Sequence, residues 1–96
     1  MLKISGIFKS CGLQVRGKGK LLSLSNRDKD KDGNFTYTYY HLWINDKISQ
    51  MIDPELKKKI AEKKAILEIA GFQKVQRVGN FTNLIIIPET IKEFRK

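Results

Sequence analysis

The sequence has 96 residues, of which 41% are hydrophobic, 9% aromatic and 30% charged, with 19 Lys and Arg against 10 Asp and Glu. Its length points to one domain with one core, placed at residues 1–96, and its apolar content argues against a disordered chain. The net charge of +9 favours polyanionic partners, with nucleic acid ahead of an anionic membrane.

Short features of the chain argue against several classes of protein. The longest aliphatic run, residues 84–87, is far shorter than the ~20 residues that cross a bilayer, and the first residues lack the apolar segment of a secretory signal. Cys11 is the only cysteine and His41 the only histidine, which excludes an internal disulfide and a Cys/His zinc site. We therefore expect a cytoplasmic protein with no metal, no cofactor and no membrane association.

The first strand is predicted from residue 2. Leu2, Ile4 and Phe8 recur with a period of two, as in a strand with one buried face, and Gly6 and Gly12 indicate a bend or bulge. Residues 17–20, Gly-Lys-Gly-Lys, are expected to form a flexible basic connection to the next strand.

A hairpin follows. Leu22 and Leu24 alternate with serines in a second strand, and residues 28–34 form an Asp-rich turn with the Asp-Gly pair typical of hairpins. The third strand, Phe35 to Ile44, is dense in aromatic and β-branched residues.

The period changes at Asp53-Pro54-Glu55, which has the N-cap, the N1 proline and the first-turn acid of a helix start. Ile52, Leu56 and Ile60 form its apolar stripe, and the helix is expected to end near Lys64.

Two further strands are predicted after the helix. They run from Ala65 to Phe72 and from Phe81 to Ile87, with a polar loop at 73–80 between them. Pro88 is expected to end the last strand, after which Ile91 and Phe94 fold back on the body.

The predicted order is β-β-β-α-β-β, a mainly β chain with one short helix. This is the arrangement of a five-stranded OB-fold barrel, although other small five-stranded barrels with one helix remain open. A ferredoxin-like fold would need a helix after the first strand, where residues 10–20 carry too much glycine.

The third strand separates two sets of side chains. Tyr40, Leu42 and Ile44 suit the barrel interior, which leaves the opposite set at least partly exposed: Phe35, Tyr37, Tyr39, His41 and Trp43. A row of exposed rings in a basic protein suits unpaired nucleic-acid bases, which stack on aromatic side chains while Lys and Arg hold the phosphates. Phe72 is a further candidate for stacking, and the candidate phosphate contacts are Arg16, Lys18, Lys20, Arg27, Lys74 and Arg77.

With these residues in view, the chain resembles the OB-fold single-stranded DNA-binding proteins, especially small ones of phages and mobile elements. Residues 3–8 are similar to the family's opening strand, and residues 22–27, which end in an Asn-Arg pair, to its second strand. Residues 40–43 are similar to the end of its third strand, where a Trp stacks on a base, and residues 69–71 to a step in its fourth strand. The loop from Lys74 to Asn80 resembles a hairpin that grips DNA in that family.

The resemblance implies sequence-tolerant binding and protection of single-stranded DNA during replication, recombination or transfer. Trp43 carries over most directly, whereas the basic C-terminal end lacks the family's flexible tail and acidic tip. Two alternatives stay open: a protein–protein module that uses the aromatic face, and an RNA-binding barrel. We expect no enzyme, because no acid–base pair or metal set is evident, and we leave open a homodimer or higher homo-oligomer.

Overall fold

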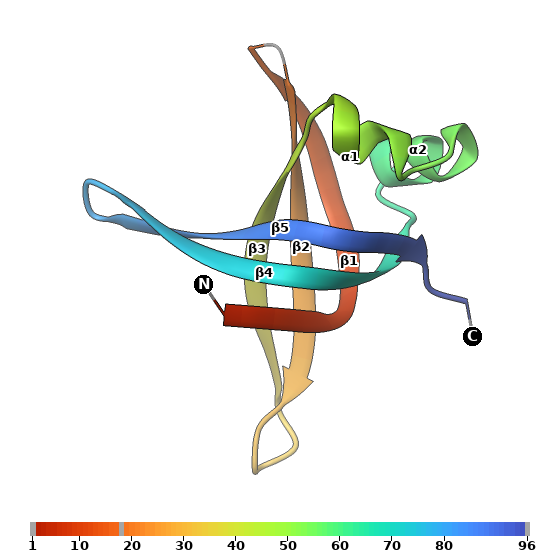
Figure 1. Cartoon of the computed structure of the whole chain (residues 1–96). Helices are drawn as coiled ribbons and strands as arrows, with labels where there is room; N and C mark the ends of the chain where they lie inside the picture. Colours follow the sequence, from red (N-terminus) through yellow and green to blue (C-terminus); the bar gives the residue numbers. More distant parts are fainter. Residues whose placement is uncertain (1, 18, 96) are drawn as a thin grey trace.

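Five strands close into a barrel in the computed structural model, which describes residues 2–17 and 19–95 (Figure 1). Around the barrel the strands follow the order β1-β2-β3-β5-β4, with β3 and β5 parallel and the other neighbours antiparallel. The predicted OB-fold barrel is confirmed. Its elements are β1 (Leu2–Arg16), β2 (Gly19–Lys29), β3 (Phe35–Ile44), α1 (Asp46–Gln50), α2 (Pro54–Ala61), β4 (Ile66–Val78) and β5 (Phe81–Glu93).

Alternate residues of every strand fill the barrel interior, as a period of two requires. Phe8 of β1 is buried, and Tyr40 of β3 packs against it edge to face with ring centroids 5.3 Å apart. The other fully buried hydrophobic residues of the strands are aliphatic: Leu22, Leu24, Leu42, Leu67, Ile69 and Ile86. Ser10 of β1 is fully buried as well. The inward set predicted for β2 and β3 is therefore confirmed at Leu22, Leu24 and Leu42.

β1 is shared between the two halves of the barrel. Its first half pairs with β4 through Lys9, and its second half pairs with β2 from Lys9 to Arg16. A bulge between Ser10 and Gly12 bends the strand at this change of partner, and Gly12 adopts a φ of 145° there. The predicted bulge is thus present. The connection between β1 and β2 is shorter than predicted, because Gly19 and Lys20 already belong to β2.

The helices close one end of the barrel (Figure 1). α2 begins as predicted, with the Asp53 side chain accepting a hydrogen bond from the Leu56 N–H at 2.7 Å, but it ends at Ala61 and not near Lys64. Its apolar stripe is buried, and Ser10 Oγ donates to the Ile60 carbonyl at 2.8 Å. The expectation of a single helix was wrong, because α1 precedes α2 with Asn45 as its N-cap.

β4 and β5 are longer than predicted and extend as a hairpin arm beyond the barrel (Figure 1). Most of the predicted loop at 73–80 is strand, with a turn at Gly79 and Asn80. Pro88 does not end β5, which continues to Glu93. A register shift next to Pro88 changes the inward-facing positions of β5 from even-numbered to odd-numbered residues. Ile86 before the shift and Ile91 after it are therefore both in the core.

Candidate nucleic-acid interface

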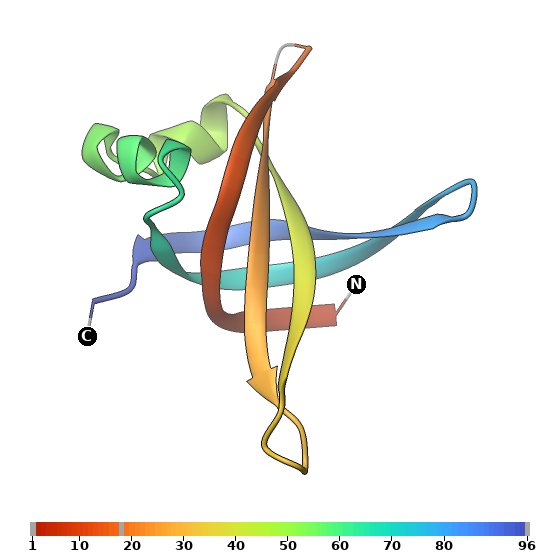
Figure 2. The same cartoon turned by 180° about the vertical axis from the view of Figure 1, so that it is seen from behind.

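Aromatic side chains project outward along β3. Phe35, Tyr37, Tyr39 and Trp43 are 48%, 54%, 65% and 44% exposed, and alternate positions lie about 6.6–7 Å apart along a strand. We call these four rings, with half-buried His41 between Tyr39 and Trp43, the ring row. Their outward alternation is the one predicted, since Leu42 on the opposite face is fully buried. Figure 2 shows β1, β2 and β3 side by side in front of β4 and β5.

β2 adds polar and basic side chains beside the ring row. Ser23, Ser25 and Arg27 lie directly opposite His41, Tyr39 and Tyr37, and directly opposed residues of an antiparallel pair share one face. The ring-row face of this hairpin is therefore half aromatic and half polar. Flat, unpaired heterocycles fit such a surface, because their faces stack on rings and their backbone meets donors and cations.

Two cations lie against the Phe35 end of the ring row. The Arg27 guanidinium carbon is 4.3 Å from the centroid of the Phe35 ring, and Lys29 Nζ is 5.3 Å from it. A cation over a ring face is attracted by the ring quadrupole, which places positive charge beside the stacking surface.

A groove of about 480 Å³ opens at the Trp43 end of the ring row. The hairpin arm forms one wall of this groove with Gln76, Asn83 and Ile85, and β1 and β2 contribute to the other walls. The β3–β5 contact between His41 and Ile85 brings the two hairpins together there. The remaining lining residues are Gln14, Arg16, Leu21, Ser23, His41 and Trp43.

The structure gathers some of the predicted phosphate contacts at this face. Arg16 lines the groove, and Arg27 lies beside the ring row. Lys74 pairs with Ile85 across the arm, on the groove-facing side of β4. These three cations are placed to accompany a strand that crosses the rings.

Other predicted residues lie elsewhere. Lys20 is on the opposite face of β2 and lines a hollow with Lys57 and Lys58 of α2. Arg77 alternates with Gln76 and is on the reverse side of the arm. Phe72 is half-buried, with cross-strand partners on β1 and β5. It is on the same side of β4 as Lys74 but is not among the residues that line the groove. Lys18 is outside the described residues.

The described cations on the ring-row face are not neutralised by ion pairs. Over residues 2–17 and 19–95, the cations in ion pairs are Lys59, Lys64, Lys92 and Arg95, and no such pair is on the β2–β3 hairpin. The shortest links α2 to β5, where Lys59 Nζ donates to Glu93 Oε2 at 2.8 Å. This hydrogen bond raises the pKa of Lys59 and lowers the pKa of Glu93.

The described residues lack both a cluster of metal-binding side chains and a membrane-spanning helix. They contain no group of three or more His, Cys, Asp or Glu side chains arranged to hold a metal ion. None of the helices in this part of the chain has the length and hydropathy of a membrane span.

Sequence reasoning missed the arm's contribution to the groove. Asn83 and Ile85 alternate with Leu84 and Ile86, but an aliphatic run from 84 to 87 hides which side faces outward. Gln76 was missed because it falls in the loop predicted at 73–80, and Gln14 because it follows the segment in which the alternation of the first strand is evident. Their outward parity follows only once β1 and β4 are known to continue as strands.

Comparisons with known proteins identify the fold but no family. No family model matches the chain, and no curated protein matches it by sequence. Among solved structures, it is similar to a small single-stranded DNA-binding protein from Streptomyces coelicolor, with a TM-score of 0.60 and 14% sequence identity. The match covers 97% of this chain and 94% of that chain.

Proposed function

We propose that this protein binds single-stranded DNA with little sequence preference, by stacking bases on the ring row while Arg16, Arg27 and Lys74 contact phosphates. The observation that carries the proposal is the outward exposure of four rings on one strand of a +9 protein. Each stacked base contributes ~1–3 kcal/mol, and every base has a flat face, so this mode of binding tolerates sequence. The solved structure of similar fold is that of a single-stranded DNA-binding protein, which supports the proposal.

Unpaired DNA fits this surface better than a duplex does. Stacked bases of a duplex expose edges and not faces, so the ring row would have no partner there. α1, with five residues, is too short to serve as a recognition helix in a major groove. The cellular role proposed is coating and protecting single strands during replication, recombination or transfer.

A fluorescence titration tests the proposal directly. Oligo-dT should quench Trp43, the only tryptophan, and affinity should fall with salt with a slope of about −0.7 per phosphate neutralised. Duplex DNA of equal length is the control, and oligo-U separates DNA binding from RNA binding by the same face. An unchanged spectrum at low salt with micromolar oligo-dT would refute the proposal.

Substitution of Trp43 measures its own contribution. Trp43→Ala should weaken binding by ~1–3 kcal/mol, about 5- to 150-fold, and Trp43→Phe should retain most of the affinity because it keeps a ring. Fluorescence anisotropy of labelled oligo-dT reports both variants, which lack the intrinsic probe. Equal affinity of Trp43→Ala and the unsubstituted protein would exclude stacking at this position.

A further inference from the structure

A second hollow lies at the other end of the ring row from the Trp43 groove. It measures about 740 Å³, and Tyr37 and Arg27 form one side of it. Ile7 and Lys9 of β1, Ile66 at the start of β4 and Phe94 after β5 form the other side. The remaining lining residues are Gly6, Ser25, Asn26 and Asp28.

The bend of β1 creates this hollow. At Lys9 the strand changes partner, with Ser25 of β2 on one side and Ile66 of β4 on the other. Asn26 Nδ2 donates to the Ile7 carbonyl at 3.0 Å, which holds β2 against the bend. The Phe94 N–H donates to the Ile66 carbonyl at 2.8 Å and fixes the end of the chain beside it.

The lining combines apolar surface with cations. Ile7 is 44% exposed and Ile66 39% exposed, so two large aliphatic side chains are open to solvent in one hollow. Lys9 and Arg27 outnumber the one carboxylate, Asp28, whose Oδ1 already accepts from the Lys29 N–H at 2.9 Å. An apolar floor with a basic rim suits a flat heterocycle that carries a phosphate.

The hollow is continuous with the ring row, since Tyr37 belongs to both and Arg27 of the hollow lies directly opposite Tyr37. We propose that a strand bound on the ring row continues past Tyr37 and places one further base against Ile7 and Ile66, with Lys9 on its phosphate. This inference rests on the proposed function and extends it. The binding track then runs from the Trp43 groove along β3 to the bend of β1.

Affinity as a function of oligonucleotide length tests this end of the track. A dT oligomer of about four nucleotides occupies the rings, and one of about eight reaches the hollow as well. Ile7→Ala combined with Lys9→Gln should weaken the longer oligomer about fivefold and leave the shorter one unchanged within twofold. Lys9→Gln alone, which removes no buried side chain, should reduce the salt slope by about 0.7 for the longer oligomer only.

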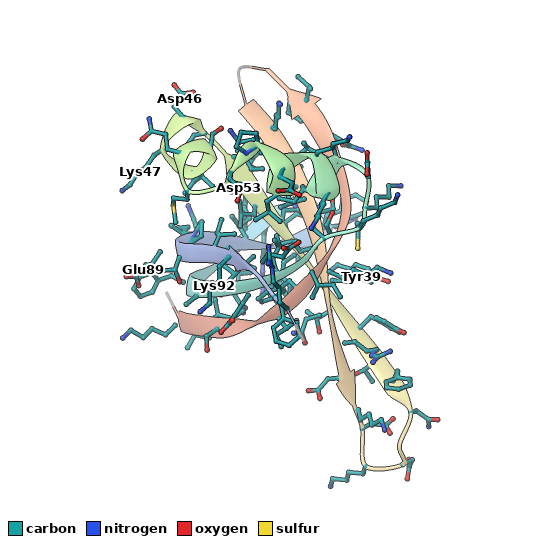
Figure 3. All side chains as sticks on the ribbon, turned by 90° about the vertical axis from the view of Figure 1, so that its right-hand side faces the viewer. Tyr39, Asp46, Lys47, Asp53, Glu89 and Lys92 are labelled. Atoms are coloured by element: carbon teal, nitrogen blue, oxygen red, sulfur yellow. The ribbon has the colours of Figure 1, made fainter. Side chains whose placement is uncertain are left out.

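Matched controls come from exposed residues outside the hollow. Val15→Ala truncates an apolar β1 side chain that is 76% exposed, and Lys47→Gln removes one charge from α1. Figure 3 shows Lys47 and Tyr39 on opposite sides of the molecule. Neither control should change the dependence on length. Acylation of Lys9, read by mass spectrometry, should slow with the longer oligomer, while that of Lys47 should not.

Several results would overturn the inference. The inference fails if the hollow variants bind both oligomers as tightly as the unsubstituted protein does, or if they bind both oligomers more weakly to the same extent. It also fails if DNA does not slow the acylation of Lys9. Loss of a DNA-free dimer in the Ile7→Ala variant, seen by sedimentation, would assign the hollow to a second copy of the chain. If the unsubstituted protein binds neither oligomer, the proposed function itself fails, and that outcome is distinct from the others.

Discussion

Tyr39 and Tyr40 are adjacent in sequence but point to opposite sides of β3, so their substitutions should have opposite consequences. Tyr39 is 65% exposed on the ring row, and Tyr40 packs edge to face on Phe8 inside the barrel. Tyr39→Ala should change the free energy of unfolding by no more than about 0.5 kcal/mol, as at other exposed positions. It should weaken oligo-dT binding by ~1–3 kcal/mol, the contribution of one stacked base.

Tyr40→Leu is the matched variant, because it keeps bulk at the inward position and removes only the ring. It should lose about 0.5–1.5 kcal/mol of unfolding free energy, the value of an aromatic pair beyond its buried area. Its affinity for oligo-dT should stay within about twofold of the unsubstituted protein.

Urea unfolding and oligo-dT titration, both followed through Trp43, measure the two effects on the same samples. Trp43 remains in both variants, so the probe is unchanged. Stacking on the outward face of β3 is refuted if Tyr39→Ala loses stability and keeps its affinity, or if Tyr40→Leu loses affinity and keeps its stability.

Two further predictions concern the fold. Gly71→Ala should destabilise the protein by about 2–3 kcal/mol in urea unfolding, because a Cβ there would overlap the Ile87 carbonyl and lie 2.8 Å from Pro88 Cα; an unchanged midpoint would contradict the described packing. Glu93→Gln should lower the melting temperature near neutral pH by removing the ion pairs that Glu93 makes with Lys59 and Arg95. Because the pKa of Glu93 is lowered in the folded protein, the difference between variant and unsubstituted protein should vanish as pH falls through that pKa, and a difference that persists in acid would exclude this cause.

Local sequence patterns predicted those elements that follow a single pattern, such as a cap or a fixed period, along their whole length. The helix start at Asp53 and Pro54 was recognisable because capping depends on a few adjacent residues. α1 had similar signals, an Asn45 cap whose side chain accepts from the Ile48 N–H at 2.9 Å, but its five residues are too few to show a helical period.

Strand ends were predicted less well, because pairing partners decide them. The mostly polar residues 73–78 form a strand because β5 pairs with them along the arm, and sequence patterns do not show this contact between segments. Pro88 is tolerated for a related reason, since it lies at a register shift, where a missing N–H disturbs the ladder least.

The sequence by itself determined which side chains of β2 and β3 point outward. Successive side chains of a strand alternate by backbone geometry, so Leu22, Leu24 and Leu42 identified the buried face and the rings the other. Only the tertiary structure decided what surrounds the ring row. Closure of the barrel puts the arm beside Trp43 and the bend of β1 beside Tyr37. These placements depend on a bulge, a register shift and pairings between distant strands. Each of these changes which side chains face a given surface, and none of them produces a periodic pattern in the sequence.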